Sequence, residues 1–333
     1  MGTRAKWLIG VLVLGVTLAA CNVVVQPVSI PFAPSVRAPR ERLVVQGTGD
    51  VNLDPGYISA FGSEGFGYAL GGLDGLFLGD DLTVVNLECA ASGLGTAVPK
   101  QFNFRCDRQD ALTQIRADGV DVANLGNNHS GDYGKEALVD SRARLSSAGI
   151  APVGVGVDAA EAAKPALFEI NGWTVAVVGF GGVVPSPDWI ATDDRAGMGD
   201  GDTIESMVAT VERADALADL VIVSIHWGRE LDLVPVPEDV ERAEAMIEAG
   251  ADAIFGHHQH RLQPMETIDG VPVAWGLGNF VWPRLSVAGA DTAVARVVFE
   301  PDGTTISCLL DATIISSGHP VLDDPTTTTC PGE

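Results

Sequence analysis

The sequence contains few basic residues. Its 333 residues include 20 Lys and Arg against 44 Asp and Glu, so the formal net charge is −24 at pH 7. Proteins that bind nucleic acid or anionic lipid surfaces carry clusters of Lys and Arg, and this sequence has no such basic stripe. The composition therefore argues against nucleic acid as a partner, and it suits a soluble surface outside the cell.

The sequence also lacks the glycine patterns of nucleotide-binding loops. It has 39 Gly, but they are scattered along the chain. The segment GVGVD at 154–158 does not have the spacing of a dinucleotide-binding fingerprint. A P-loop pattern and internal repeats are also absent from the sequence. These absences argue against the common nucleotide-binding loops and against repeat architectures.

The first 21 residues have the pattern of an export signal. A basic start precedes an apolar stretch, and residues 18–21 read LAAC. This ending resembles a bacterial lipobox, in which the cysteine is lipidated and becomes the mature N-terminus. The alternative is an uncleaved anchor helix, but the apolar run is shorter than the ~20 residues that a bilayer requires. We therefore expect an exported lipoprotein on the outer face of the cell membrane, anchored to the membrane through Cys21.

The rest of the chain divides into a tether, a domain and a tail. Residues 22–42 contain four Pro, which prevents a regular element and predicts a tether. Residues 43–317 are near the upper size limit for one hydrophobic core, so we expect one domain rather than two. Residues 318–333 include four consecutive Thr and are predicted to be a mobile tail.

Four cysteines remain after Cys21. An even number in an exported chain favours disulfides, and four cysteines allow three pairings. We expect the pairs Cys89–Cys106 and Cys308–Cys330, because loop-like sequence separates the members of each pair.

Apolar runs and helical patterns alternate from residue 42 onward, which indicates stacked βα units. The dipeptides at 171–172, 269–270 and 302–303 are Asn-Gly or Asp-Gly, which favour tight turns between antiparallel strands. The Gly-rich stretch 55–81 has no readable pattern. The sequence therefore predicts a sheet with parallel and antiparallel parts, covered by helices. The predicted helices are 108–118, 135–148, 203–217 and 237–249, and the first predicted strands are 42–50, 82–88 and 120–125.

The chain has only six His, and five of them follow apolar runs. The segment ADAIFGHHQH at 251–260 places three of them within four positions. Side chains on an extended segment alternate, so His258 and His260 are expected to face one side and His257 the other. Several imidazoles at strand ends indicate a metal site.

Polar side chains follow the other predicted strands as well. The carboxyl ends of parallel strands meet at one edge of a sheet, so these side chains are expected to converge. Carboxylates, a carboxamide and imidazoles without thiolate suit Mn, Fe or Zn rather than Ca. Each residue alone also fits a turn or a helix cap, and only the joint pattern predicts a site for two metals. The candidates at these strand ends are Asp50, Glu88, Asn127, Asn128, His129, His226, His257, His258 and His260.

Six ordered blocks of sequence closely resemble the capsule-synthesis CapA family. They are GTGD, VVNLEC, LGNNHSGDYG, SIHWGRE, GADAIFGHHQHRLQPME and WGLGNF, and the match runs from about Leu43 to Val281. This family is associated with poly-γ-glutamate capsule biosynthesis and is similar to calcineurin-type metallophosphoesterases. The resemblance implies an α/β fold of two packed mixed sheets flanked by helices, a four-layer α/β/β/α sandwich.

The resemblance also implies roles for individual residues. His129 would be the proton donor, and Asp132 would hold or tune its imidazole unless Asp132 only stabilises the local turn. Asn52 occupies the place of a ligand histidine in the phosphoesterases, and it remains a further candidate with Asn127 and His257. Trp227 and Phe280 would line the pocket or belong to the core. The implied metal ligands are Asp50, Glu88 as the bridging carboxylate, Asn128, His226, His258 and His260.

The implied activity is hydrolysis of a phosphoester, with two divalent transition metals activating water. Two alternatives remain open at this stage. One is a non-catalytic tethered subunit of a complex with capsule synthase or export proteins, and the other is metal-dependent cleavage of an amide bond in the polymer. Direct binding of the polyanionic polymer is disfavoured, because the net charge of −24 opposes it.

Overall fold

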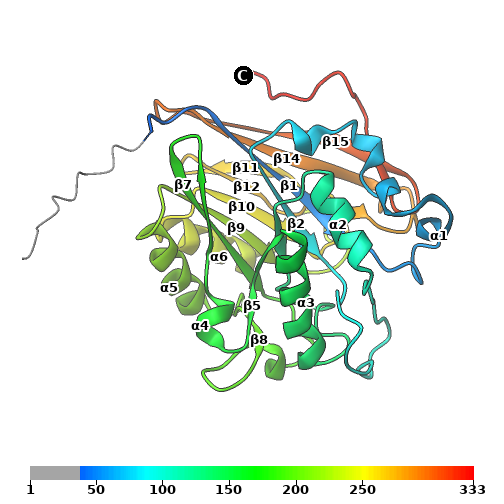
Figure 1. The fold of residues 1–333 in the computed structure, drawn as a ribbon. Helices are drawn as coiled ribbons and strands as arrows, with labels where there is room; N and C mark the ends of the chain where they lie inside the picture. Colours follow the sequence, from blue (N-terminus) through cyan, green and yellow to red (C-terminus); the bar gives the residue numbers. More distant parts are fainter. Residues whose placement is uncertain (1–37) are drawn as a thin grey trace, which may run out of the picture. The chain divides into compact units, whose positions relative to one another are not determined.

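Two large β-sheets carry most of the strands in the computed structural model, which describes residues 38–333 (Figure 1). The predicted signal peptide, Cys21 and residues 22–37 of the predicted tether lie outside the described residues. No helix within residues 38–333 is long and apolar enough to cross a membrane.

The first sheet contains eight strands and joins the two ends of the described chain. Its order is β16-β15-β14-β1-β2-β3-β4, and β13 also pairs with β1. Strands β1 to β4 and β13 are parallel, whereas β14, β15 and β16 are antiparallel to their neighbours. The bounds are β1 Leu43–Val51, β2 Leu82–Leu87, β3 Val122–Asn124, β4 Ala151–Val153, β13 Asn279–Val281, β14 Asp291–Phe299, β15 Thr305–Ser316 and β16 His319–Leu322.

The second sheet has six strands in the order β11-β12-β10-β9-β7-β6. Its four central strands are parallel, and the antiparallel strands β11 and β6 form the edges. The short strands β5 (Val155–Gly156) and β8 (Gly197–Met198) form a separate pair. The bounds are β6 Ala166–Ile170, β7 Trp173–Gly181, β9 Leu220–His226, β10 Ala253–His257, β11 Met265–Ile268 and β12 Val271–Ala274.

Helices cover the outer face of each sheet, with α5 and α6 on one side and α2 and α3 on the other (Figure 1). The stretch 55–81, which had no readable pattern, forms α1 and three short 3₁₀ helices. The bounds are α1 Ala60–Glu64, α2 Gln109–Ala117, α3 Lys135–Ala148, α4 Ala159–Ala162, α5 Ile204–Asp215 and α6 Pro237–Glu248, with 3₁₀ helices at Phe66–Tyr68, Gly71–Leu73, Leu76–Leu78 and Pro187–Trp189.

Three apolar cores hold these layers together. Val45, Val84, Val177, Ile222 and Phe255 belong to the core between the two sheets, and all are fully buried. One further core lies under α2 and α3, and another lies under α5 and α6. The layers are therefore helix, sheet, sheet and helix, which confirms the predicted α/β/β/α architecture.

The sheets approach each other closely where β1 crosses β10. A Cβ atom added at Gly47 would lie 2.6 Å from the ring of Phe255. A glycine is required there, because any larger side chain would push the two strands apart. This close approach brings the ends of strands from both sheets to one place.

The three predicted hairpins are present as β6–β7, β11–β12 and β14–β15. Asn171 has φ 51° and Asp269 has φ 49°, and each is followed by a glycine with positive φ. These residue types tolerate the left-handed conformation of such turns. The four predicted helices are also present, each within two residues of the expected bounds.

Both expected disulfides are found, Cys89–Cys106 and Cys308–Cys330. The expected mobile tail at 318–333 is contradicted, because β16 pairs with β15 inside this segment. Glu333 also forms an ion pair with Arg296 at 2.7 Å. The domain therefore extends through the described C-terminal residues rather than ending at 317.

Candidate metal centre

The strands of both sheets deliver polar side chains to one edge. Asp50 lies at the end of β1, and Glu88 directly follows β2. His226 is the last residue of β9 and pairs in register with His257, the last residue of β10. Asn128 follows β3 after a short loop. The convergence expected at the carboxyl ends of parallel strands is therefore present.

Two groups of side chains have ligand atoms close enough to share a metal ion. The first is Glu88, His226 and His258, and the second is Asp50, Glu88 and His260. Within each group all ligand atoms lie within 4.8 Å of one another. Glu88 belongs to both groups, as a bridging carboxylate between two ions must.

Asn128 joins the first group. Its Oδ1 atom lies 3.1 Å from Nε2 of His226. Its main-chain oxygen accepts a hydrogen bond from Nζ of Lys100 at 2.6 Å, which fixes the loop that carries it. All six residues named as ligands thus gather in one place.

Glu88 is the clearest sign that this site fits a cation. The residue is fully buried, and neither carboxylate oxygen has a hydrogen-bond partner among the described residues. Burial, and then the negative charge of Asp50, raise the pKa of Glu88 well above its ordinary value. Leaving even a neutral buried polar group without a hydrogen bond costs ~1–3 kcal/mol, and a charged group costs more. A buried carboxylate without hydrogen bonds is therefore destabilising unless a cation offsets its charge. The donor set of carboxylate, imidazole and carboxamide suits Mn, Fe or Zn.

The two histidines of the first group have lowered pKa values, which favour the neutral imidazole. Burial, and then the charge of His258, lower the pKa of His226 well below its ordinary value. Burial lowers the pKa of His258 to about 4, and His260 adds to this effect. A neutral imidazole has a free lone pair, which metal coordination requires.

Asp50 and His260 form a charged pair within the second group, with Oδ2 and Nδ1 3.1 Å apart. Burial raises the pKa of Asp50, but the adjacent His260 outweighs it, so the net pKa is lowered. Burial lowers the pKa of His260, and Asp50 outweighs it, so that pKa is raised. Without a metal, each group therefore stabilises the charge of the other.

His258 and His260 converge by a route that differs from the prediction. Strand β10 ends at His257, and the following backbone is not extended, since φ is 100° at His258 and 53° at His260. The two ring centroids lie 6.1 Å apart. A left-handed turn, rather than the alternation of a strand, brings them together. Non-glycine residues seldom adopt such angles, so the surrounding structure must hold these two histidines in place.

His257 lies behind the site and belongs to neither group. Its Nε2 atom lies 3.0 Å from the hydroxyl of Ser224, and its Nδ1 atom lies 3.9 Å from Oδ1 of Asp50. Burial lowers its pKa to about 4, against the opposing effect of Asp50. His257 therefore lies next to Asp50 without a hydrogen bond to it.

Asn52 and Asn127 both form hydrogen bonds to nearby main-chain atoms. Oδ1 of Asn52 accepts a hydrogen bond from the amide of Asp54. The side chain of Asn127 donates to the main chain of Leu87 and accepts from the amide of His129. Asn127 therefore holds the loop that presents Asn128 and His129.

His129 and Asp132 form a buried dyad beside the metal ligands. Nδ1 of His129 lies 2.8 Å from Oδ2 of Asp132. Lys100, which sequence analysis missed, lies 2.6 Å from Oδ1 of Asp132 and 3.2 Å from Nδ1 of His129. Asp132 also accepts from the amide of Phe104 at 2.7 Å, so it combines an orienting role with a loop-holding one. No sequence pattern marked Lys100, because it lies in an irregular loop.

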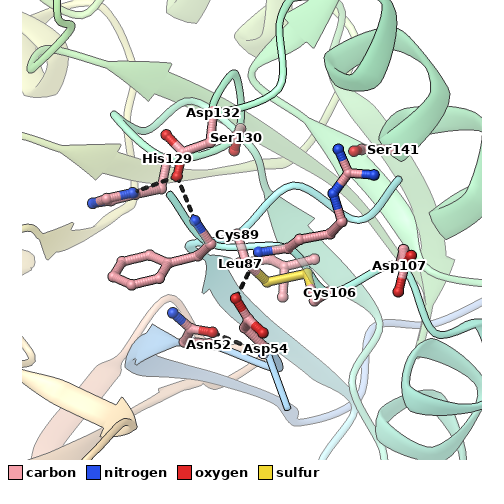
Figure 2. Close-up of a disulfide and its surroundings, with 12 residues drawn as sticks. Asn52, Asp54, Leu87, Cys89, Cys106, Asp107, His129, Ser130, Asp132 and Ser141 are labelled. Atoms are coloured by element: carbon pink, nitrogen blue, oxygen red, sulfur yellow. Dashed lines mark hydrogen bonds and ion pairs between the residues drawn. A yellow bond between two sulfur atoms is a disulfide. The ribbon is translucent and has the colours of Figure 1, made fainter. Parts of the chain in front are cut away.

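The disulfide Cys89–Cys106 anchors that loop to the site, as Figure 2 shows. Cys89 follows Glu88 directly, and the amide of Ala90 donates to the main chain of Phe104. The ring of Phe104 lies 4.3 Å from that of His129. One covalent bond thus connects the residue next to Glu88 to the segment that carries Phe104.

A cavity of about 250 Å³ opens onto His129 and His260. Three aromatic side chains, Tyr57, Phe104 and Trp282, form one wall. The lining also includes Asn279, whose buried Oδ1 has no hydrogen-bond partner among the described residues. The two aromatic residues named from sequence do not line this cavity. Trp227 and Phe280 are fully buried in the apolar cores.

The fold and the site together define a two-sheet α/β protein with a candidate metal centre of carboxylates and imidazoles at its strand ends. The chain belongs to the bacterial capsule synthesis protein PGA_cap family, whose model matches residues 44–284. This confirms the family resemblance, and the match includes every residue of the candidate centre.

Three relatives illustrate the membership. The PGA biosynthesis protein CapA of Bacillus subtilis is 33% identical over 184 residues, covering 55% of this chain and 48% of the relative. The capsule biosynthesis protein CapA of Bacillus anthracis is 31% identical over 202 residues, covering 60% and 49%. A probable polyglutamine synthesis accessory protein of Mycobacterium tuberculosis is 31% identical over 224 residues, covering 64% and 58%. The chain spans about half the length of the curated relatives it matches.

Proposed function

We propose that this chain is a dinuclear metal-dependent hydrolase that cleaves a phosphoester during poly-γ-glutamate capsule biosynthesis. The observation that carries the proposal is Glu88, a fully buried carboxylate that belongs to both ligand groups and has no hydrogen-bond partner among the described residues, with Nε2 of His226 3.6 Å from its Oε1. A single metal would need only one of these groups. Two groups that share one carboxylate match the arrangement of two-metal phosphatases.

The candidate ligands fall into two sets, one for each metal ion. Asp50 and His260 would hold one ion, and His226, His258 and Asn128 would hold the other. When bound, two divalent cations supply positive charge to the phosphoryl oxygens and activate water at neutral pH. The buried ligand set keeps competing water away from the carboxylates.

His129 is the proton donor to the leaving oxygen. Asp132 and Lys100 both contact its Nδ1 side, which leaves Nε2 for the substrate. Burial lowers the pKa of His129, and Asp132 opposes this effect. The pKa of His129 is lowered overall, and the negative charge of a bound phosphoester would favour the imidazolium form that can donate a proton.

The metal-loaded chain should therefore hydrolyse an aryl phosphate, and this activity should disappear in Glu88→Ala. An amide hydrolase would instead release amines from a γ-glutamyl polymer and leave the aryl phosphate intact. A non-catalytic subunit would turn over neither compound but would purify with membrane-bound synthase or export proteins. The names of the relatives refer to capsule and polyglutamine synthesis, which supports a role in polymer synthesis. The phosphoesterase, the amide hydrolase and the non-catalytic subunit would all share this role.

The proposal also places the centre outside the cell, because Cys21 would be lipidated and would hold the protein on the membrane. Detergent phase partitioning tests this point. The mature protein should enter the detergent phase, and Cys21→Ser should remain in the aqueous phase. A mature protein found in the aqueous phase with another N-terminal residue would contradict it.

A further inference from the structure

Exposed apolar side chains surround the mouth of the cavity over the candidate centre. Phe102, Leu231 and Leu285 line the same cavity as His129 and His260, and their exposed fractions are 50%, 58% and 73%. Water-exposed leucines at a cavity mouth are costly in an isolated molecule, and contiguous apolar patches of this kind mark binding surfaces. The mouth of the cavity therefore suits the apolar part of a ligand.

The same loops carry further exposed apolar residues. Leu233 and Val234 follow Leu231 closely, and Val287 follows Leu285. Six of the twelve large apolar side chains that are exposed within residues 38–333 belong to this mouth or its adjoining loop residues. We call Phe102, Leu231, Leu233, Val234, Leu285 and Val287 the apolar rim.

Leu231 is held in place against its backbone preference. Its φ is 70°, a left-handed conformation that Gly or Asn adopts more readily than Leu. Its amide donates to the main-chain oxygen of Gln259 at 2.8 Å. The side chain of Gln263 donates to the main chains of Asp232 and Val234, each at 3.0 Å. The loop is thus fixed by hydrogen bonds, and a strained leucine is kept at the mouth.

An aromatic wall connects this rim to the reacting groups. The ring of Phe104 lies 4.3 Å from His129, and the ring of Trp282 lies 4.8 Å from His260. Tyr57 packs against Phe104, with ring centroids 4.5 Å apart. The cavity is therefore polar at its histidine floor, and its mouth carries these apolar side chains beside the exposed Glu230 and Ser286. Because His129 protonates the leaving oxygen, the apolar side chains next to it are placed to contact the leaving alcohol.

We propose that the substrate of this centre is an amphiphile, a phosphoester of an alcohol with a long apolar chain. The inference rests on the proposed phosphoester hydrolysis. Water adds to phosphorus and releases one proton to solvent, the bond from phosphorus to the alcohol oxygen breaks, and that oxygen takes the proton of His129, which solvent then replaces. The apolar chain lies along Phe104 and passes between Leu231 and Leu285. The net charge opposes adsorption to an anionic membrane surface, so the rim receives the chain of the substrate itself.

Binding of two phosphonates to the full chain loaded with Mn²⁺ tests this inference without relying on turnover. Dodecylphosphonate carries the apolar chain, and methylphosphonate carries only the head group. Calorimetric titration below the micelle concentration should give at least tenfold tighter binding for dodecylphosphonate. This ratio should fall toward one in the double variant Leu231→Asn with Leu285→Ser. Asn tolerates the left-handed backbone, so this variant is expected to fold.

Leu217→Ser is the matched control, because Leu217 is 56% exposed, close to Leu231, and does not line this cavity. It should retain the full affinity ratio. Equal affinities of the wild type for both phosphonates would overturn the amphiphile inference and leave phosphoester hydrolysis standing. An unchanged ratio in the rim variant, or an equal loss in Leu217→Ser, would also overturn the inference. Failure of both phosphonates to bind would overturn the proposed function as well.

Discussion

Nδ1 of His129 lies 2.8 Å from Oδ2 of Asp132, and Lys100 reaches the other oxygen of the same carboxylate at 2.6 Å. This relationship gives His129 a fixed orientation without making it a metal ligand. It also separates two kinds of residue in a crowded site. His226, His258 and His260 belong to the ligand groups, whereas His129 belongs to the dyad.

Replacing His129 with Ala should therefore preserve metal content and reduce turnover. General acid catalysis contributes on the order of 10²–10⁴ in rate. The loss should be largest for alkyl phosphates and smallest for nitrophenyl phosphate, because a good leaving group needs little protonation. Steady-state kinetics with both substrates and metal analysis of the same preparation measure this. Loss of metal in His129→Ala would remove the assignment as proton donor.

Replacing His258 with Ala should lower metal affinity by at least about tenfold, since even second-layer changes at metal sites cost 10–100-fold. Excess Mn²⁺ should restore part of the activity. His257→Ala is the comparison, because His257 lies 3.9 Å from Asp50 but belongs to neither ligand group. Its loss of affinity, measured by competition with a chelator, should be smaller. A larger loss of metal affinity in His257→Ala than in His258→Ala would indicate that His257, rather than His258, is the ligand.

Glu88→Gln should stabilise the metal-free protein at neutral pH. The folded-state pKa of Glu88 is raised, so the folded protein retains a proton that the unfolded chain releases above pH ~4.5. This cost is absent at low pH and grows as the pH rises, and Gln does not carry it. In chelator, the Tm of Glu88→Gln should therefore exceed that of the wild type by an amount that increases from pH 5 to pH 8. Added Mn²⁺ should stabilise the wild type more and reverse the order. A Tm difference that does not change with pH would contradict a buried, unpaired Glu88.

The two disulfides provide a matched pair for testing the loop over the dyad. They close loops of similar sequence separation, 17 and 22 residues, so removal of either should cost about 3 kcal/mol of unfolding free energy. Only Cys89–Cys106 anchors the segment that carries Lys100 and Phe104. Cys89→Ala with Cys106→Ala should therefore lower kcat well below that of Cys308→Ala with Cys330→Ala. Equal kcat values in folded preparations would show that the loop does not assist the dyad.

Local rules predicted much of this fold from sequence. Asn171 and Asp269 marked their turns because few residues tolerate positive φ, and the helix over 135–148 ends where Gly149 adopts φ 83°. The stretch 55–81 was unreadable because its short 3₁₀ helices have no apolar period and depend on packing. Strand β16 was missed because only four residues form it, and its pairing with β15 is a tertiary contact.

The site was predicted less evenly. Asp50, Glu88, His226 and their neighbours were readable because each follows an apolar strand. Lys100 and Trp282 were not, because an irregular loop and a distant strand end bring them to the centre only in the folded chain. The turn at His258 and His260 depends on positive φ angles that no local sequence pattern indicated.

The metal content of the purified protein tests the central claim most directly. After incubation with Mn²⁺ or Zn²⁺ and removal of unbound ions, elemental analysis of the wild type should give close to two ions per chain. Glu88→Ala should lose at least one of them while remaining folded by circular dichroism. A folded wild-type protein that binds no transition metal under these conditions would contradict the dinuclear centre and the hydrolytic function built on it.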